Sequence, residues 1–326
     1  MTKVLVTGAA GFIGFHLCRK LATNTDYQIV GLDNLNEYYD RKLKDDRLSE
    51  LREIGNFVFI KADIADAKAL DALFEENGFD VVINLAAQAG VRYSIDCPDT
   101  YIESNVVGFY NILQACRNHG IRHLIFASSS SVYGDQDKIP FSESDKTDCP
   151  VSLYAATKKC DEELAYAYSS MFGIQITGLR FFTVYGPFGR PDMAYYKFAD
   201  KIRLGQTIEL YNNGDMLRDF TYVDDVVNVI ERLIDRVTEG EGIRFKIYNI
   251  GKGSPDSLLT FVETIERLYG KKTDKRLLPM QTGDVHRTFA DTTEIERDLG
   301  YRPSVSLEEG LGRFIEWYKR YYGVSE

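Results

Sequence analysis

Cysteine and histidine are scarce in this sequence, and neither occurs at a spacing that binds metal. The 326 residues include five cysteines and four histidines, and no two cysteines form a C-x-x-C pair. Because zinc sites and disulfide frameworks need such pairs or clusters, the sequence predicts no metal site and reduced thiols, as in a cytosolic protein. These residues are Cys18, Cys97, Cys116, Cys149, Cys160, His16, His119, His123 and His286.

Positive charge and long apolar runs are also scarce. Lysine and arginine total 39 against 49 acidic residues, the formal net charge is -10, and no basic run interrupts the acidic background. A protein that binds nucleic acid needs a basic surface for the phosphates, so no nucleic-acid partner is expected. No apolar run approaches the ~18 residues of a membrane span. The first three residues lead straight into VLVTG without a secretory signal, which favours a cytoplasmic protein with no membrane partner.

What the sequence does contain is an alternation of β-branched runs and helical patterns, which is typical of βαβ units. It predicts an α/β fold: a doubly wound parallel Rossmann sheet with a smaller C-terminal α/β lobe that binds the substrate. No low-complexity linker is present, so the lobe is expected to pack tightly on the sheet. We expect strands at 3–7, 28–33, 57–62, 81–86, 123–128, 175–182, 208–211, 220–222 and 246–250. Helices are expected at 11–23, 67–76, 98–119, 154–171, 194–203, 224–237, 257–269, 293–299 and 306–321.

Three glycines, Gly8, Gly11 and Gly14, recur at three-residue spacing in VLVTGAAGFIGFHL, between the first strand and the first helix. Glycines there let the backbone approach a pyrophosphate, and the helix N-terminus supplies free N–H groups. Asp33 follows nineteen residues after Gly14, at the end of the second strand, where a carboxylate accepts from ribose hydroxyls and repels a 2′-phosphate. A plain glycine-rich turn would explain the triplet alone. Strand, helix and acid together predict NAD as cofactor, in preference to NADP.

Further candidate cofactor contacts follow the neighbouring strands. Asp63, in KADIAD, can reach the adenine edge or, equally, cap the next helix. The NLAAQAG segment ends the fourth strand with small residues, which a cofactor lying across the strand ends requires and which close sheet packing would also explain. Besides the three glycines and Asp33, the candidate cofactor-binding residues are Phe12, Ile13, Asn34, Asp63, Ile64, Leu85, Ala86, Ala87, Tyr154 and Lys158.

Tyr154 and Lys158 lie four residues apart in SLYAATKKCDEEL, so their side chains share one face of the predicted helix. A free tyrosine, with a pKa of ~10, is a poor base at neutral pH, whereas an ammonium one turn away and a cationic nicotinamide favour the phenolate. Such a pair can exchange a proton with a sugar hydroxyl while the cofactor takes or returns hydride. A packed aromatic beside a solvated lysine would give the same spacing.

The glycine motif, Asp33, the Y-x-x-x-K pair and Ser129, twenty-five residues before Tyr154, together resemble the extended short-chain dehydrogenase/reductases that act on nucleotide sugars. The resemblance covers essentially the whole chain. It implies that Tyr154 is the catalytic acid/base and that Ser129 shares a hydrogen bond with the reacting hydroxyl. Lys158 would bind the nicotinamide ribose and tune the tyrosine.

The two residues after Ser129 indicate the fate of a 4-keto sugar. Related dehydratases carry an Asp-Glu pair at these positions, and related decarboxylases carry a glutamate at the second, whereas this chain has Ser130 and Ser131. Without an acid there, simple re-reduction is favoured, which makes epimerisation the leading interpretation.

Three stretches, LDNLNEYYDRKLKDDRL, LAAQAGVRYSI and LRFFTVYGPFGRPDMA, closely resemble the UDP-glucuronate 4-epimerases, which interconvert UDP-glucuronate and UDP-galacturonate. A uronate carries an extra carboxylate, and hydroxyls of Ser130, Ser131 and Thr183 with the guanidinium of Arg190 would suit it. Arg190 could instead be a solvent-facing loop cation. A 4-ketouronate loses carbon dioxide when the C–CO2 bond lies perpendicular to the carbonyl plane. The hydroxyls are therefore hypothesised to hold the carboxylate away from that orientation.

The resemblance also implies contacts for the diphosphate and the uracil. Arg218 and Arg287 fall where the family binds phosphates, and Tyr211 falls where an aromatic stacks on uracil, although ion pairing within the fold would explain either arginine. Residues 1–186, with 219–250 returning to them, would form the NAD-binding domain. Residues 187–218 and 251–326 would form the nucleotide-sugar lobe.

Three alternatives remain open from the sequence. A UDP-glucose 4-epimerase or a UDP-glucuronate decarboxylase of the same family would keep the same catalytic residues. A non-catalytic NAD-binding sensor would keep the fold, although it has no need for Ser129, Tyr154 and Lys158. Homodimerisation through the helices at 98–119 and 154–171 is expected from the resemblance, and their apolar stripes are compatible with it.

Overall fold

Seven parallel strands form the central sheet of the computed structural model, which describes residues 1–236, 243–280 and 286–324. Their order is β11-β6-β5-β4-β1-β2-β3, and each neighbouring pair is parallel. The first six strands have the order of a doubly wound nucleotide-binding sheet, so the fold class expected from the sequence is confirmed. The strands are β1 (Thr2–Thr7), β2 (Tyr27–Asp33), β3 (Phe57–Lys61), β4 (Val81–Asn84), β5 (His123–Ser129), β6 (Gln175–Phe181) and β11 (Phe245–Ile250).

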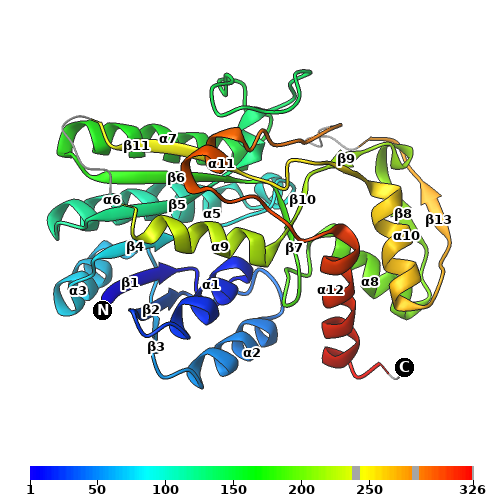
Figure 1. Ribbon diagram of the computed structural model, residues 1–326, viewed down its shortest axis with the longest axis horizontal. Helices are drawn as coiled ribbons and strands as arrows, with labels where there is room; N and C mark the ends of the chain where they lie inside the picture. Colours follow the sequence, from blue (N-terminus) through cyan, green and yellow to red (C-terminus); the bar gives the residue numbers. More distant parts are fainter. Residues whose placement is uncertain (237–242, 281–285, 325–326) are drawn as a thin grey trace.

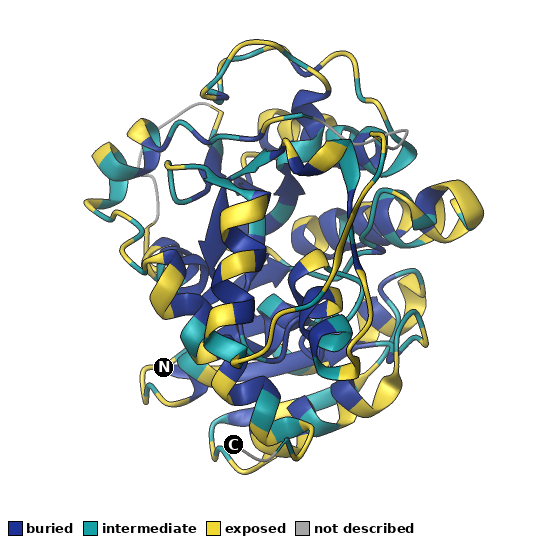
Figure 2. Cartoon of the chain, turned by 90° about the vertical axis from the view of Figure 1, so that its right-hand side faces the viewer, coloured by how far each residue is buried: buried dark blue, intermediate teal, exposed yellow. Residues whose placement is uncertain are grey.

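The strands are apolar because both faces of the sheet are covered. In β1, Val4 and Val6 pack into one apolar cluster, while Leu5, pointing the other way, packs into a second. Figure 2 shows the strands in the buried class at the centre, surrounded by helices that are buried on one side and exposed on the other. A parallel sheet of this kind binds ligands at the carboxyl ends of its strands.

Two groups of helices supply the two covers. α1 (Phe12–Ala22), α2 (Arg41–Arg52) and α9 (Val223–Ile234) contribute to the first apolar cluster. α3 (Ala67–Asn77), α6 (Gly108–Asn118) and α7 (Leu153–Phe172) contribute to the second. Before α6, two short helices, α4 (Tyr93–Asp96) and α5 (Pro98–Tyr101), lead into a π-helical turn, η1 (Ile102–Val107). The helix predicted at 98–119 is therefore interrupted by a wider turn.

The C-terminal elements lie beside one end of the sheet, on the right in Figure 1. They comprise α8 (Ala194–Leu204), α10 (Leu258–Tyr269), α12 (Leu307–Tyr321) and β8 (Ile208–Leu210) paired with β13 (Lys275–Leu277). Tilted ring contacts join them to the helices that cover the sheet: the Phe188 ring centroid lies 4.9 Å from that of Phe15 on α1 and 4.9 Å from that of Trp317 on α12. The continuous aromatic packing explains why no flexible linker is needed.

Shorter elements connect these parts. β7 (Thr183–Tyr185) pairs with β10 (Phe220–Tyr222), and β9 (Leu217–Arg218) pairs with β12 (Asp256–Ser257). The remaining elements are η2 (Ser130–Tyr133), η3 (Tyr211–Gly214) and α11 (Thr293–Leu299). Within the described ranges, no helix combines the length and the apolar character needed to cross a membrane.

The sequence did not predict α2. Its sequence, RKLKDDRLSELR, reads as solvated because charged residues dominate it. In the structure, Leu43, Leu48 and Leu51 are buried together with Lys44 and Arg47, and Arg47 is completely buried. The charged side chains thus complete the inward face of the helix. Elsewhere the predicted elements agree to within a few residues, and position 237, the predicted end of α9, lies outside the described residues.

Candidate active site

A cavity of about 450 Å³ opens at the carboxyl ends of β1, β4 and β5. Its wall combines the loop before α1, the strand ends, the first two turns of α7 and the segment after β7. It brings together nearly all of the candidate residues: Gly8, Gly11, Phe12, Ile13, Gly14, Asp33, Asn34, Asp63, Ile64, Leu85, Ala86, Ala87, Ser129, Ser130, Ser131, Tyr154, Lys158, Thr183, Arg190 and Arg218. Tyr211 and Arg287 are the two candidates that do not line it.

Neighbouring backbone atoms leave no room for a side chain at Gly8 or Gly14 of the glycine loop. Gly8 has a φ of +70°, and a Cβ there would lie 2.8 Å from the Ala86 nitrogen. A Cβ on Gly14 would lie 2.1 Å from the Gly8 carbonyl oxygen. Gly11, at the N-cap of α1, has no side chain to accept from the first N–H groups of the helix. These groups can bind an anion, so the loop fits the pyrophosphate of a dinucleotide.

Asp33 closes the adjoining end of the cavity. Its carboxylate accepts from the Leu35 amide at 2.8 Å and from the Ala10 amide at 3.2 Å, so its position is determined by backbone on both sides. The Lys44 ammonium lies 3.7 Å from the same carboxylate and also lines the cavity. Burial lowers the pKa of Lys44, and Asp33 opposes that shift. A carboxylate at this place suits ribose hydroxyls, as expected for NAD.

Asp63 is not the cap of the next helix. It accepts from the Asn34 side chain and from the Ala65 amide, each at 2.9 Å, and it lines the cavity. The N-cap of α3 is Asp66, which accepts from the amides of Lys68 and Ala69. The capping alternative for Asp63 was therefore wrong, and its carboxylate is available at the cofactor end of the cavity.

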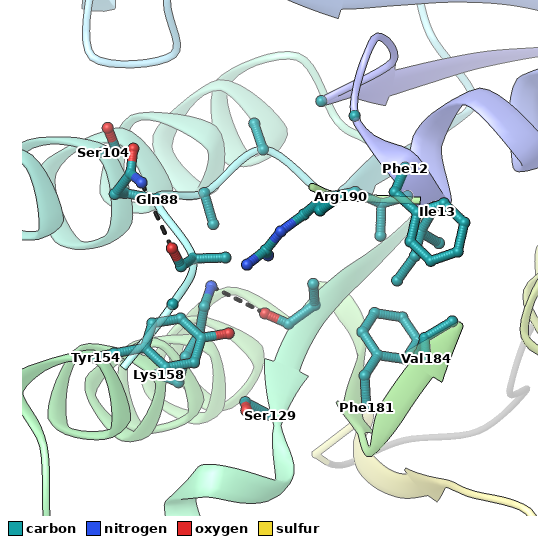
Figure 3. Close-up of a pocket in the computed structure, with 18 of the residues that line it drawn as sticks. Phe12, Ile13, Gln88, Ser104, Ser129, Tyr154, Lys158, Phe181, Val184 and Arg190 are labelled. Carbon is teal, nitrogen blue, oxygen red and sulfur yellow. Dashed lines mark hydrogen bonds between the residues drawn. The ribbon is translucent and has the colours of Figure 1, made fainter. Parts of the chain in front are cut away.

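Tyr154 and Lys158 occupy the first and second turns of α7, which begins where Ser152 accepts from the Ala155 amide. Figure 3 shows both side chains pointing into the cavity, with Ser129 at the strand end nearby. The Tyr154 ring packs edge-to-face against Tyr101, with centroids 6.1 Å apart. The Lys158 ammonium donates to the Ala127 carbonyl oxygen at 3.1 Å. The helix thus presents a phenol and an ammonium side by side.

The four serines at the end of β5 have different partners. Ser128 donates to the buried Glu162 carboxylate at 2.6 Å, and Glu162 in turn forms an ion pair with Arg180. Ser131 donates to Ser129 Oγ at 2.9 Å. Ser129, Ser130 and Ser131 all line the cavity, and no acidic side chain separates them from it.

Arg190 reaches the cavity from the segment after β7 (Figure 3). Its guanidinium forms two hydrogen bonds with the Asp192 carboxylate, at 3.0 and 2.6 Å, and the Tyr38 hydroxyl donates to the same carboxylate at 3.2 Å. Burial raises the pKa of Tyr38 to about 12. Although burial favours the neutral acid, Arg190 lowers the pKa of Asp192. The Arg190 guanidinium is therefore fixed in the cavity wall by Asp192, and the alternative of a solvent-facing loop cation does not apply.

The residues predicted to contact the diphosphate and the uracil lie only partly in the cavity lining. Arg218 lines the cavity and donates to the carbonyl oxygens of Leu217 and His286. Arg287 is exposed, and its backbone forms a parallel bridge with Leu217. The backbone at Arg218 and the backbone at Arg287 therefore lie close together in space. The Arg92 guanidinium lies over the Tyr211 ring, 5.2 Å from the centroid of the ring.

Sequence reasoning missed several residues that shape the site. Arg47 donates to the Ala10 carbonyl in the glycine loop and to the Phe188 carbonyl, so it ties the loop to the segment that carries Arg190. Gln88 and Ser104 line the cavity near Tyr154. A charged residue in a polar helix carries no local signal of such a role, because the acceptor carbonyls are distant in sequence.

Comparison with known proteins identifies relatives of this chain in sequence and in structure. The model of a family described as the NAD dependent epimerase/dehydratase family matches residues 4–251. The chain is similar to a probable UDP-glucuronate 4-epimerase from Rhizobium meliloti, with 45% identity covering 98% of each. It is 44% identical to UDP-glucuronate 4-epimerase 3 of Arabidopsis thaliana, over 98% of this chain and 77% of the relative. The crystal structure of UDP-glucuronic acid 4-epimerase from Bacillus cereus, in complex with UDP-glucuronic acid and NAD, matches with a TM-score of 0.92 and 34% identity, covering 98% of this chain and 100% of that chain.

Proposed function

The chain belongs to the NAD-dependent epimerase/dehydratase family, and we propose that it interconverts UDP-glucuronate and UDP-galacturonate by epimerisation at C4 of the sugar. The observation that carries this proposal is the row of hydroxyls, Ser129 to Ser131, facing the same cavity as Tyr154, Lys158 and Arg190. The site holds an acid/base pair and a cation for a carboxylate, and the strand end contributes no acid. The similarity to UDP-glucuronate 4-epimerases supports it.

NAD fits the inner half of the cavity. The amides at the start of α1 would hold the pyrophosphate, and Asp33 would accept from the adenosine ribose. When bound, NAD supplies a transient hydride acceptor at the sugar C4, so none is consumed in a complete cycle.

The proton chemistry belongs to Tyr154 and its neighbours. As C4 is oxidised, Tyr154 takes the proton of the O4 hydroxyl, and it returns that proton when C4 is reduced on the opposite face. The Lys158 ammonium, one turn along α7, stabilises the phenolate, and Ser129 donates to the reacting oxygen. Each proton given up is returned, so no net acid or base is produced.

The carboxylate of the sugar distinguishes this reaction from its relatives. We propose that Ser130, Ser131, Thr183 and Arg190 hold it, because their polar groups line one cavity and carry the complementary charge. Held in this way, the carboxylate is kept away from the perpendicular orientation in which a β-keto acid loses carbon dioxide. The ketosugar would then turn over while anchored through its UDP.

Three further residues would anchor the UDP part of the substrate. Arg218 and Arg287 would bind the diphosphate, and Tyr211 would stack on uracil. Residues 1–186 and 219–250 would then bind NAD, and residues 187–218 and 251–326 would bind the nucleotide sugar. A cytoplasmic location stays a prediction.

We also propose a homodimer built on the helices at 98–119 and 154–171. Tyr110 is 44% exposed, Tyr166 47% and Met171 62%, which leaves large apolar side chains uncovered on α6 and α7. Size-exclusion chromatography with light scattering measures the mass, and a monomer at micromolar concentration would contradict this part of the proposal.

The decisive experiment incubates the purified protein with UDP-glucuronate and with UDP-glucose side by side, and identifies products by proton NMR. We expect conversion of UDP-glucuronate to UDP-galacturonate, with little turnover of UDP-glucose and no net loss of NAD. An unchanged C4 configuration would refute epimerisation. UDP-pentose with carbon dioxide would identify a decarboxylase instead.

Tyr154→Phe separates an enzyme from a non-catalytic NAD-binding sensor. The variant keeps the ring packed on Tyr101 and removes only the hydroxyl. An enzyme should lose turnover by a factor of about 10²–10⁴ while still binding NAD. Tyr269→Phe, on α10, is the matched control and should keep full activity. NAD binding without detectable turnover in the wild type and in both variants would argue for the sensor.

A further inference from the structure

Lys158 is paired with a buried carboxylate that the proposed reaction does not use. Asp161, one turn further along α7, accepts from the Lys158 ammonium at 3.0 Å through Oδ2. The two side chains are 3% and 1% exposed. The second protein contact of the ammonium is the Ala127 carbonyl at 3.1 Å, and an ammonium has three N–H donors. Two donors are therefore taken by the protein, and one is left to face the cavity.

Within the part of the chain that the structure describes, the surroundings of Asp161 offer it no compensating charge besides Lys158. Its Oδ1 is buried and has no hydrogen-bond partner among the described residues. The charged or titratable groups that act on it or respond to it are Lys158, Glu162 and Cys160, all on α7. Glu162 has the same sign and is engaged by Arg180 of β6, while β5 faces Lys158 with the Ala127 carbonyl. The ion pair of Asp161 with Lys158 is thus the interaction that compensates its charge.

We propose that Asp161 is a positioning residue for Lys158, holding the ammonium between its own carboxylate and the Ala127 carbonyl and offsetting part of the positive charge that acts on Tyr154. The proposal rests on the proposed function in one respect, that Tyr154 is the acid/base.

The charge of this pair changes with the protonation of Asp161. With Asp161 ionised, the pair is close to neutral, and with Asp161 protonated it carries the full charge of Lys158. Burial raises the pKa of Asp161 to about 6, and the neighbouring ammonium opposes this rise. As the pH falls, Asp161 takes up a proton and Lys158 stabilises the phenolate more strongly.

The first test needs neither cofactor nor substrate. Asp161→Asn removes the charge with almost no change of shape. In the wild-type protein the unfolded chain ionises this residue near 3.8 and the folded chain only near 6. Stability is therefore lost as the pH rises between those values and is constant above them. The melting temperature of the variant minus that of the wild type should rise by roughly 5 °C from pH 4 to pH 6.5 and then level off. A difference that does not vary with pH would contradict the proposal.

The second test measures the dependence of kcat on pH with UDP-glucuronate. Without the carboxylate, Lys158 acts with its full charge, so the acid limb of the profile should move to lower pH by up to about 1 unit. Its plateau should change by less than about 5-fold. Asp161→Ala, which removes the same charge with a different shape, should show the same displacement. The matched control is Glu163→Gln, which removes an equal charge from the exposed side of α7 and should leave the profile in place.

The results separate this inference from the proposed function. A wild-type protein without epimerase activity would refute the function, and the melting experiment would still test Asp161. An active wild-type protein whose Asp161→Asn and Asp161→Ala variants keep the wild-type acid limb would overturn the inference. A shift in the alanine variant alone would attribute the effect to a lost hydrogen bond and would also overturn the claim about charge.

Discussion

Ser131 donates two hydrogen bonds to one atom of Ser129: its hydroxyl reaches Ser129 Oγ at 2.9 Å and its amide reaches the same oxygen at 3.2 Å. A serine oxygen has two lone pairs and one hydrogen, so both acceptor positions of Ser129 are engaged. What remains is its O–H, which can only donate into the cavity. In the proposed reaction, the neighbouring serine would therefore leave Ser129 as the donor to an oxygen on which negative charge develops.

Ser131→Ala should weaken this arrangement without changing the product. Loss of one hydrogen bond, about 1 kcal/mol, lets the Ser129 hydroxyl turn away, so kcat should fall by about 3- to 10-fold. Ser131→Thr keeps a hydroxyl and should retain most of the activity. Steady-state kinetics with UDP-glucuronate measure both, and equal losses in the two variants would contradict the role of the hydroxyl.

Ser131→Glu should change the product itself. A carboxylate at this position repels the sugar carboxylate, so that the C–CO2 bond can turn perpendicular to the ketone. We expect UDP-pentose and carbon dioxide to appear, or elimination products, while epimerisation falls by at least about 10-fold. Proton NMR of the products decides. A variant that forms only UDP-galacturonate, at any rate, would show that the serines do not select the outcome.

Arg190→Ala should affect the uronate more than the neutral sugar. The guanidinium is already oriented by its two bonds to Asp192, and a charge-assisted hydrogen bond to the substrate carboxylate contributes about 1.5–3 kcal/mol. The value of kcat/KM for UDP-glucuronate should fall by about 10- to 100-fold, whereas any activity with UDP-glucose should change little. Equal losses for both sugars would assign Arg190 to the fold and not to specificity.

Gly14→Ala should abolish NAD binding and destabilise the protein, because its Cβ would collide with the Gly8 carbonyl, 2.1 Å away. Gly312→Ala provides the contrast, since it lies within α12 and the added Cβ would meet no atom within 4 Å beyond its chain neighbours and the backbone of its own helix. It should raise the free energy of unfolding by about 1 kcal/mol. Calorimetric titration with NAD and thermal melting test the pair, and a Gly14→Ala variant with wild-type NAD affinity would contradict the assigned loop.

His123→Gln should make the protein less sensitive to acid. His123 is buried on β5, where burial, followed by the nearby Arg122, lowers its pKa from 6.5 to about 4. Between these values the unfolded chain binds a proton that the folded chain does not, so stability falls as the pH drops below 6.5. The loss amounts to on the order of 3 kcal/mol by pH 4.

Denaturant titrations of both proteins between pH 7 and pH 4 measure this loss, and the glutamine variant should show a shallower decline. His119→Gln, at a partly exposed histidine that pairs with Asp71, is measured alongside as the control for the exchange of a histidine for a glutamine. Parallel curves for wild type and His123→Gln would contradict the assignment to His123.

Local patterns were sufficient to predict the sheet, the glycine loop and the position of Tyr154 and Lys158 on one face of a helix. Strand and helix periodicities are properties of a few consecutive residues, and Gly8, Gly11 and Gly14 or Tyr154 and Lys158 act through neighbours in the same loop or helix. For that reason the order of elements and most cavity-lining residues were predictable. Tyr211 and Arg287, whose assignment came from resemblance, lie outside the cavity lining.

The contacts that hold the site together depend on distant parts of the chain. Arg47 donates to the Phe188 carbonyl oxygen, 141 positions away in the sequence, and α2 was missed because the buried Lys44 and Arg47 complete an inner face that its three leucines form only in part. For Asp63 the sequence left two equal interpretations. The hydrogen bond from Asn34 and the N-cap position of Asp66 decided between them. The sequence by itself determined which groups could bind a dinucleotide and which could transfer a proton, since these are matters of residue type and spacing. Only the tertiary structure decided how each charge is compensated, such as Asp161 on Lys158, because electrostatic partners are set by proximity in space.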